Sequence, residues 1–273
     1  MRRLTLEGTD ISVSRLSFGT ASLHHISTSR RRQDLLAAAF DNGFSHFDTA
    51  PYYGFGIAED ELGRFLKGRG GRVTVATKVG LYSPGGSHGN MISVWARKLA
   101  GKVLPSLSRP VANWSIARAA ESLEISLRRL RIDHVDLLLL HEPEASAVQS
   151  EAFLEWLREQ KGKGRVGAWG LAGEADRIES WLSIDHPLAM VLQVRDSLER
   201  READLVRKRR REPQITYGYL SSLASSLQGR DAMGTLEKAL RRKTAGSILV
   251  STRKIERIGE LAAVAARDDG DAD

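Results

Sequence analysis

Three strand-like segments of the chain end in residues suited to proton transfer. One segment ends in Asp48, the segment 73–78 ends in Lys78, and the segment 135–141 ends in His141. Five residues beyond Asp48 lies Tyr53. A tyrosine gives up its proton only reluctantly near neutral pH unless a neighbouring cation stabilises the phenolate. Together these side chains could form a general acid and base with its supporting charges.

The three strand-end residues are expected to share one face of a sheet. Side chains alternate along a strand, so Lys78 lies on the same face as Ala76, and His141 lies on the same face as Leu139. A buried lysine beside a buried Asp48 is costly as mere structure, because desolvation of the two charges can outweigh their attraction. We therefore interpret the group as a functional site.

Apolar runs alternate with amphipathic segments along the chain, and glycine, proline and Asn/Asp clusters separate them. Each expected strand is followed by an expected helix, of which the clearest runs from Ile116 to Leu130 with Ser115 as its N-cap. Eight such units predict an α/β fold, a closed (β/α)₈ TIM barrel of parallel strands. The expected strands are the segments 16–20, 45–48, 73–78, 135–141, 166–170, 191–194, 215–218 and 248–251.

An open doubly wound sheet is the rival arrangement, but the Gly-x-Gly-x-x-Gly turn typical of it is missing. The segments 4–6 and 11–13 predict a short N-terminal β-hairpin that closes one end of the barrel. The barrel is expected to form a single domain of residues 1–267, followed by a disordered acidic tail of residues 268–273. The long connection 81–113, with Pro84-Gly85-Gly86 and Trp95, is typical of a functional loop.

The composition is that of a globular protein able to bury a large core, with 41% apolar and 27% charged residues in a chain of 273. The absence of cysteine excludes disulfides and thiolate metal sites. The formal charge of +7 is spread over separate basic clusters, so nucleic acid is not an expected partner. No apolar run has the length of a membrane span or the character of a signal peptide. We expect a cytoplasmic protein without membrane contact or bound metal, a monomer or small homo-oligomer.

Three motifs resemble those of the aldo-keto reductase superfamily. They are Phe-Asp-Thr-Ala-Pro-Tyr-Tyr-Gly at 47–54, Ala-Thr-Lys at 76–78 and Leu-Leu-Leu-Leu-His-Glu-Pro at 137–143. The resemblance implies an NAD(P)H-dependent oxidoreductase that reduces an aldehyde, ketone or sugar carbonyl to the alcohol, or runs the reverse reaction, by hydride transfer. It implies Tyr53 as the general acid and base. Asp48 and Lys78 would then tune the pKa of Tyr53, and His141 would orient the carbonyl oxygen.

The same resemblance implies residues that bind a nicotinamide cofactor. Gln193 would hold the carboxamide, and Tyr217 would stack on the nicotinamide ring. The segment 251–260 would take the adenosine phosphate at a helix N-terminus, where anions are favoured. NADP(H) is the expected cofactor, with NAD(H) less favoured, and small carbonyl compounds or alcohols are the expected partners. The implied cofactor residues are Gly19, Thr20, Asp48, Gln193, Tyr217, Gly218, Leu220, Ser251, Thr252, Arg253, Arg257 and Glu260.

Two other functions stay open at this point. A non-catalytic barrel that binds or senses NADP(H) is the first, because Ala172-Gly173 stands where the family usually has Ser-Asn. The second is a metal-dependent hydrolase built on His141 and Glu142, which would need more strand-end ligands than the chain supplies. The tyrosine, lysine, aspartate and histidine group favours the reductase.

Overall fold

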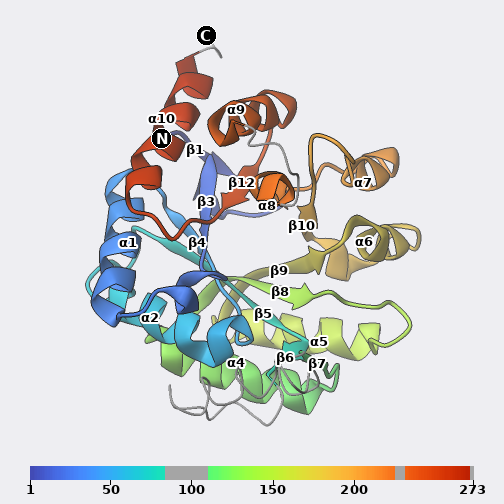
Figure 1. The fold of residues 1–273 in the computed structure, drawn as a ribbon. Helices are drawn as coiled ribbons and strands as arrows, with labels where there is room; N and C mark the ends of the chain where they lie inside the picture. The colour runs from blue at the N-terminus through green and yellow to red at the C-terminus, as the bar shows by residue number, and fades with distance from the viewer. Residues whose placement is uncertain (84–109, 225–230, 271–273) are drawn as a thin grey trace, which may run out of the picture.

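The structure, a computed structural model, describes residues 1–83, 110–224 and 231–270. Eight parallel strands close into a barrel in the order β10-β11-β12-β3-β4-β5-β8-β9. Helices surround this barrel on the outside (Figure 1). The prediction of a (β/α)₈ barrel is therefore confirmed. The barrel strands are β3 (Leu16–Gly19), β4 (His46–Asp48), β5 (Thr74–Val79), β8 (Val135–His141), β9 (Val166–Gly173), β10 (Val191–Arg195), β11 (Ile215–Tyr217) and β12 (Ser247–Val250).

Helical segments follow every barrel strand, and in the described ranges two α-helices follow β11. The α-helices are α1 (Ser29–Asp41), α2 (Ile57–Leu66), α4 (Ile116–Leu130), α5 (Ser150–Gly162), α6 (Ala175–Leu182), α7 (Asp204–Lys208), α8 (Tyr219–Ala224), α9 (Ala232–Arg242) and α10 (Glu256–Gly270). Short 3₁₀ turns are η1 (Leu23–His25), η2 (Tyr53–Gly56) and η4 (Pro187–Ala189).

Helix α4 forms where the sequence predicts it. The Ser115 side chain accepts a hydrogen bond from the backbone N–H of Arg118, which satisfies one of the free N–H groups at the helix start. Its buried positions include Ala119, Leu123, Leu127 and Leu130, at successive spacings of four, four and three residues. This stripe packs the helix onto the barrel and leaves the charged residues of the other face outside.

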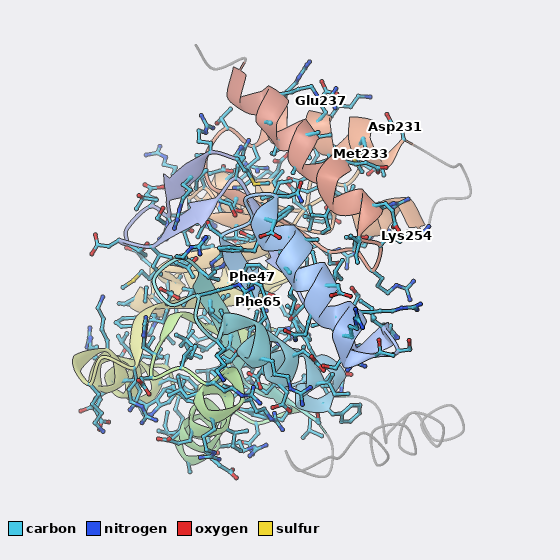
Figure 2. All side chains as sticks on the ribbon, turned by 90° about the vertical axis from the view of Figure 1, so that its left-hand side faces the viewer. Phe47, Phe65, Asp231, Met233, Glu237 and Lys254 are labelled. Atoms are coloured by element: carbon cyan, nitrogen blue, oxygen red, sulfur yellow. The ribbon has the colours of Figure 1, made fainter. Side chains whose placement is uncertain are left out.

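Two apolar layers hold the barrel together. Side chains on one face of each strand, such as Val75 and Leu138, pack outward under the helices. Phe47 and Phe65 belong to this outer layer, with ring centroids 5.2 Å apart (Figure 2). Side chains on the opposite strand face fill the barrel interior; they include Ala76, Leu137, Leu139, Ala168 and Val191. The alternation that places Lys78 toward the barrel axis therefore holds.

The predicted hairpin covers the barrel interior at the amino ends of the strands. Strands β1 (Arg3–Thr5) and β2 (Ser12–Ser14) pair antiparallel. Leu6, Ile11 and Val13 from this hairpin are buried in the same cluster as the inward residues of the barrel strands. The hairpin thus covers the amino ends of the strands, and the candidate residues lie at the opposite, carboxyl ends.

The long connection after β5 and the C-terminal tail are the two remaining segments for which the sequence made a prediction. Strands β6 (Leu81–Tyr82) and β7 (Val111–Ala112) form a two-stranded ribbon at the base of the long connection. The proposed functional loop itself, at 84–109, lies outside the described residues. The disordered tail was expected from residue 268, but α10 continues to Gly270, because the helix started by residues 256–265 extends through the polar residues that follow. Residues 271–273 are not described.

No helix within the described ranges combines the length and the apolar character needed to span a lipid bilayer.

Candidate active site

Asp48, the last residue of β4, and Lys78 on β5 form a buried ion pair at the carboxyl end of the barrel. Lys78 Nζ lies 2.6 Å from Oδ1 and 2.7 Å from Oδ2 of Asp48, and 3.0 Å from the carbonyl oxygen of Thr49. Both side chains are 2% exposed. The three acceptors match the three N–H donors of an ammonium group. Lys78 is therefore fully paired inside the protein.

Residues from β10 and from the turn after β3 fix the Asp48 side of this pair. Gln193 on β10 donates from Nε2 to Oδ2 of Asp48 at 3.1 Å. Thr20, just after β3, donates from its hydroxyl to the Asp48 carbonyl oxygen at 2.9 Å. Gln193 Oε1 is buried and has no hydrogen-bond partner among the described residues. Gln193 thus presents an unsatisfied acceptor beside the ion pair.

Tyr53 stands on the turn η2 that follows β4. Gly54 and Phe55 have φ of 60° and 59°, and Gly56 has φ of 93°, so the chain turns sharply after Tyr53. A Cβ added to Gly54 would lie 2.4 Å from Cβ of His24, which only a glycine avoids. This turn explains how a residue five positions beyond a strand end returns to the barrel mouth.

The phenol ring of Tyr53 lies between Lys78 and His141. Its centroid is 4.9 Å from Lys78 Nζ. The His141 ring lies 5.9 Å away at an interplanar angle of 90°. Tyr53, Lys78 and His141 therefore converge as the sequence predicts.

The protonation of Tyr53 depends first on its burial. Burial raises the pKa of Tyr53 well above its usual value, and the charges of Asp48 and Glu142 raise it further. The sequence led us to expect that Lys78 and Asp48 tune this pKa; burial is the largest effect on it, and the Asp48 charge raises it. Asp48 and Thr49 take the ammonium's hydrogen bonds, and burial disfavours the phenolate. Tyr53 is consequently a protonated phenol across the neutral range.

His141 is a neutral imidazole. Burial, followed by the positive charge of Lys78, lowers the pKa of His141 to about 3. Its Nδ1 is buried and has no hydrogen-bond partner within the described part of the chain. A neutral imidazole can donate one hydrogen bond and accept one. His141 can therefore position an oxygen atom without carrying a charge.

A cavity of about 350 Å³ opens beside Tyr53, between β3, β11, β12 and the helices that follow them. It gathers the catalytic candidates Asp48 and Tyr53 with most of the cofactor residues expected from the sequence. Arg257, in the first turn of α10, also lies at the cavity. The expected residues that line the cavity are Gly19, Asp48, Tyr53, Tyr217, Gly218, Leu220, Ser251, Thr252 and Arg257.

Four other cofactor candidates lie elsewhere. Thr20 and Gln193 are buried beneath the cavity, where they hold Asp48. Arg253 and Glu260 are exposed and do not line it. Arg253 lies in the turn between the end of β12 at Val250 and the start of α10 at Glu256, and Glu260 lies on an exposed face of α10. Contact of these four residues with a cofactor stays a prediction.

Sequence reasoning missed several lining residues. Ser221 and Met233 contribute to the cavity wall from α8 and α9, and Met233 is labelled in Figure 2. Ser221 follows a strand-end glycine closely, which is a usable signal. Met233 carries no such signal, because only the packing of α9 against the barrel brings it there.

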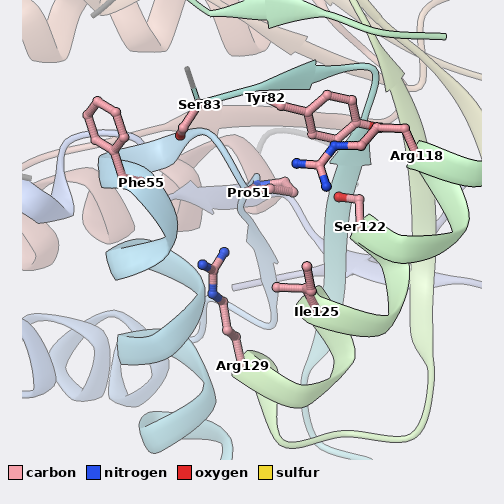
Figure 3. Close-up of a pocket in the computed structure, with 8 residues that line it drawn as sticks. All are labelled: Pro51, Phe55, Tyr82, Ser83, Arg118, Ser122, Ile125 and Arg129. Carbon is pink, nitrogen blue, oxygen red and sulfur yellow. The ribbon is translucent and has the colours of Figure 1, made fainter. Parts of the chain in front are cut away.

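Two further hollows lie away from this group. A recess between α2 and α4 has a volume of only about 10 Å³, enough for about one water molecule. Figure 3 shows its lining residues, among them Pro51, Tyr82, Arg118 and Arg129. A cavity of about 740 Å³ lies at the opposite end of the barrel beside the hairpin, lined by His134, Asp136 and Lys161 among others. In the described ranges, no three His, Asp or Glu side chains converge as a metal site would require.

Residues 15–208 match the model of the aldo/keto reductase family. The chain belongs to this family. The match includes Asp48, Tyr53, Lys78 and His141, so the resemblance found in the sequence is confirmed at the level of the family.

The names of similar proteins in this family describe different substrates. A pyridoxal 4-dehydrogenase of Microbacterium luteolum is 30% identical over 152 residues, 49% of this chain and 41% of the relative. An NADH-specific methylglyoxal reductase of Escherichia coli is 30% identical over 196 residues, 67% of this chain and 55% of the relative. The chain thus spans about half the length of the curated relatives it matches. An aldo-keto reductase of Klebsiella pneumoniae in complex with NADPH has a TM-score of 0.69 at 19% identity, covering 97% of this chain and 90% of the other, and shares the fold.

The residues of this aldo/keto reductase fit a nicotinamide cofactor. The orphaned acceptor Gln193 Oε1 suits the N–H₂ of a carboxamide. The cavity presents the ring of Tyr217 as a flat apolar surface. Arg257 supplies a cation at a helix N-terminus, where the exposed N–H groups already favour anions.

Proposed function

We propose that this chain is an NADPH-dependent oxidoreductase that interconverts a small carbonyl compound and its alcohol, with Tyr53 as the general acid and base. The supporting observation is the convergence of Tyr53, His141 and the Asp48–Lys78 pair beside one cavity. Family membership supports the reaction class. The substrate class of aldehydes, ketones or sugar carbonyls is proposed from the resemblance.

Tyr53 would act as the proton donor in the reducing direction. Its raised pKa, caused first by burial, keeps the phenol protonated and ready to donate. When the proton leaves, Tyr53 becomes a phenolate. The centroid of its ring lies 4.9 Å from Nζ of the Lys78 ammonium. The fixed cation would limit the cost of that negative charge, because it needs no reorganisation when the proton moves.

His141 would position the carbonyl oxygen. As a neutral imidazole it can donate to that oxygen without attracting a proton from Tyr53. Its ring edge faces the Tyr53 ring at 90°, so one oxygen atom could be approached by both side chains.

The cofactor would occupy the cavity between Tyr217 and Arg257. Gln193 would accept from the carboxamide, Tyr217 would stack on the ring, and Arg257 would attract the adenosine phosphate. When bound, a nicotinamide cofactor supplies or accepts the hydride that the protein's own side chains cannot provide.

The purified protein should be tested with NADPH and a panel of aldehydes, ketones and sugars, and with NADP⁺ and the corresponding alcohols. The proposal requires turnover of at least one pair, lost in Tyr53→Phe. Cofactor binding with no turnover of any substrate in either direction would instead favour a binding or sensing barrel.

A further inference from the structure

Glu142, which directly follows His141 at the end of β8, has a backbone conformation that is more common for glycine. Its φ is 55°, in the left-handed region that few non-glycine residues occupy. Its N–H donates to the carbonyl oxygen of Ala172 at 2.7 Å, which ties the residue to the end of β9. This conformation directs the carboxylate across the neighbouring strand end.

The carboxylate of Glu142 fills the space beside Gly173. A Cβ added to Gly173 would lie 2.7 Å from Glu142 Oε2, so the glycine makes room for the carboxylate. Oε2 also accepts the N–H of Glu174 at 3.2 Å and lies 3.6 Å from Nε of Arg177. Oε1 has no hydrogen-bond partner in the described part of the chain. One oxygen is therefore held in place and the other is available.

The surrounding charges leave Glu142 only partly neutralised. Arg177 is shared with Glu144, whose Oε1 it contacts at the shorter distance of 2.7 Å. Arg195 is engaged with Glu174 at 3.2 Å. The three glutamates thus face two arginines, and the excess charge is negative. Glu142 is about one quarter exposed, with its side chain at 25%, so water screens the charge incompletely.

Glu142 directly follows His141, whose ring lies 5.9 Å from the ring of Tyr53, and is tied to the end of β9, so its carboxylate lies at the same end of the barrel as the cavity. After burial, the negative charge of Glu142 is among the causes that raise the pKa of Tyr53 and of Tyr217. Both rings line the proposed cofactor cavity. A positively charged ring placed between them would feel the same negative charge as an attraction, whereas a neutral ring would not.

We infer that Glu142 selects the redox state of the bound cofactor: its carboxylate stabilises the positively charged, oxidised nicotinamide ring more than the neutral, reduced one. The inference rests on the proposed function, because it requires a nicotinamide at Tyr217. We therefore expect the dissociation constant of NADP⁺, divided by that of NADPH, to be lower in the wild type than in a variant without the Glu142 charge. On the protein, the equilibrium between the two cofactor forms shifts toward NADP⁺ and alcohol.

The test is a calorimetric titration of NADP⁺ and NADPH into the wild type and Glu142→Gln, which keeps shape and removes charge. We expect the variant to weaken NADP⁺ about three- to tenfold relative to NADPH, as a partly screened charge at close range would. Glu159→Gln is the matched control, because this glutamate lies on the outer helix α5, is 55% exposed and pairs with Lys163 instead of Arg177, so the ratio should stay nearly unchanged.

A second variant should change the preference for NADP⁺ over NADPH in the opposite direction. Arg177→Gln removes the partial counter-charge of Glu142, so the preference for NADP⁺ should increase, and it should not increase in Glu142→Gln/Arg177→Gln. An unchanged ratio in both single variants, or equal losses of both cofactor forms in Glu142→Gln, would overturn the inference and leave the proposed function standing. A wild type that binds neither form would overturn both.

Discussion

Lys78 gives its hydrogen bonds to Asp48 and Thr49, and it faces Tyr53 only through its charge, with Nζ 4.9 Å from the ring centroid. This arrangement separates two roles. The pair holds the floor of the site rigid, while the ammonium supplies a fixed positive field under the phenol. Catalysis and stability are therefore expected to respond differently to substitutions at Tyr53 and at Lys78.

Tyr53→Phe should lower turnover by about 10²- to 10⁴-fold, the usual contribution of a general acid. The phenol oxygen is expected to contact only the reacting oxygen, so cofactor dissociation constants should stay within about twofold of wild type. Steady-state rates on the best substrate, with titrations of NADPH, measure both quantities. Retention of more than about a tenth of the wild-type rate would assign proton transfer to another group.

Lys78→Met should destabilise the fold as well as the reaction. Removing one partner of a pair that is 2% exposed on both sides leaves a buried Asp48 carboxylate without its cation, which typically costs about 3–5 kcal/mol. Asp48→Asn/Lys78→Met should recover part of that loss, because no buried charge remains. Urea unfolding measures both variants. A single Lys78→Met variant as stable as the wild type would show that the pair is not buried in solution.

Much of the barrel could be predicted from the sequence, because a two-residue alternation within a strand leaves few ways to orient it. That rule alone places Ala76 and Lys78 toward the axis, and the inner cluster containing Ala76 confirms it. The position of the hairpin at one end of the barrel could also be predicted, because its apolar residues Leu6 and Ile11 need an apolar surface to cover.

Electrostatics at the site could not be predicted in the same way. The upward pKa shift of Tyr53 depends first on burial and then on the summed charges around it, including Glu142 from another strand. Whether Arg253 or Arg257 lines the cavity depends on where α10 begins, and a helix start is uncertain by a few residues from sequence alone.

His46 should make the protein less stable as the pH falls from about 6.5. Burial, then the charge of Lys78, lowers the pKa of His46 to about 3 in the folded state. Between that value and the ordinary value of 6.5, the unfolded chain binds the proton and the folded chain does not, so stability is lost with falling pH. The contribution is at most about 1.4 kcal/mol per pH unit.

Urea unfolding of the wild type and His46→Asn between about pH 6.5 and 5 isolates this contribution, because the two proteins share every other titrating group. The wild type should show the steeper loss. Parallel slopes in the two proteins would mean that His46 takes up its proton in the folded state, against its burial at 0% exposure.

Arg257 and Arg253 give a matched pair for the preference between NADPH and NADH. Both belong to the segment between β12 and the first turn of α10, but only Arg257 lines the cavity. A charge-assisted hydrogen bond to phosphate favours the ligand that carries it. Arg257→Ala should therefore weaken NADPH by about tenfold and leave NADH almost unchanged, and Arg253→Ala should have the smaller effect.

Added salt should weaken NADPH more than NADH in the wild type, because an exposed arginine and a phosphate are screened by ions. In Arg257→Ala that difference in salt dependence should shrink. Calorimetric titrations of both cofactors at two ionic strengths provide the measurement. If the two variants lose NADPH affinity equally, the phosphate lies between the two arginines. If neither loses any, or if the wild type binds NADH as tightly as NADPH, the segment does not read the adenosine phosphate, and the proposed preference must be withdrawn.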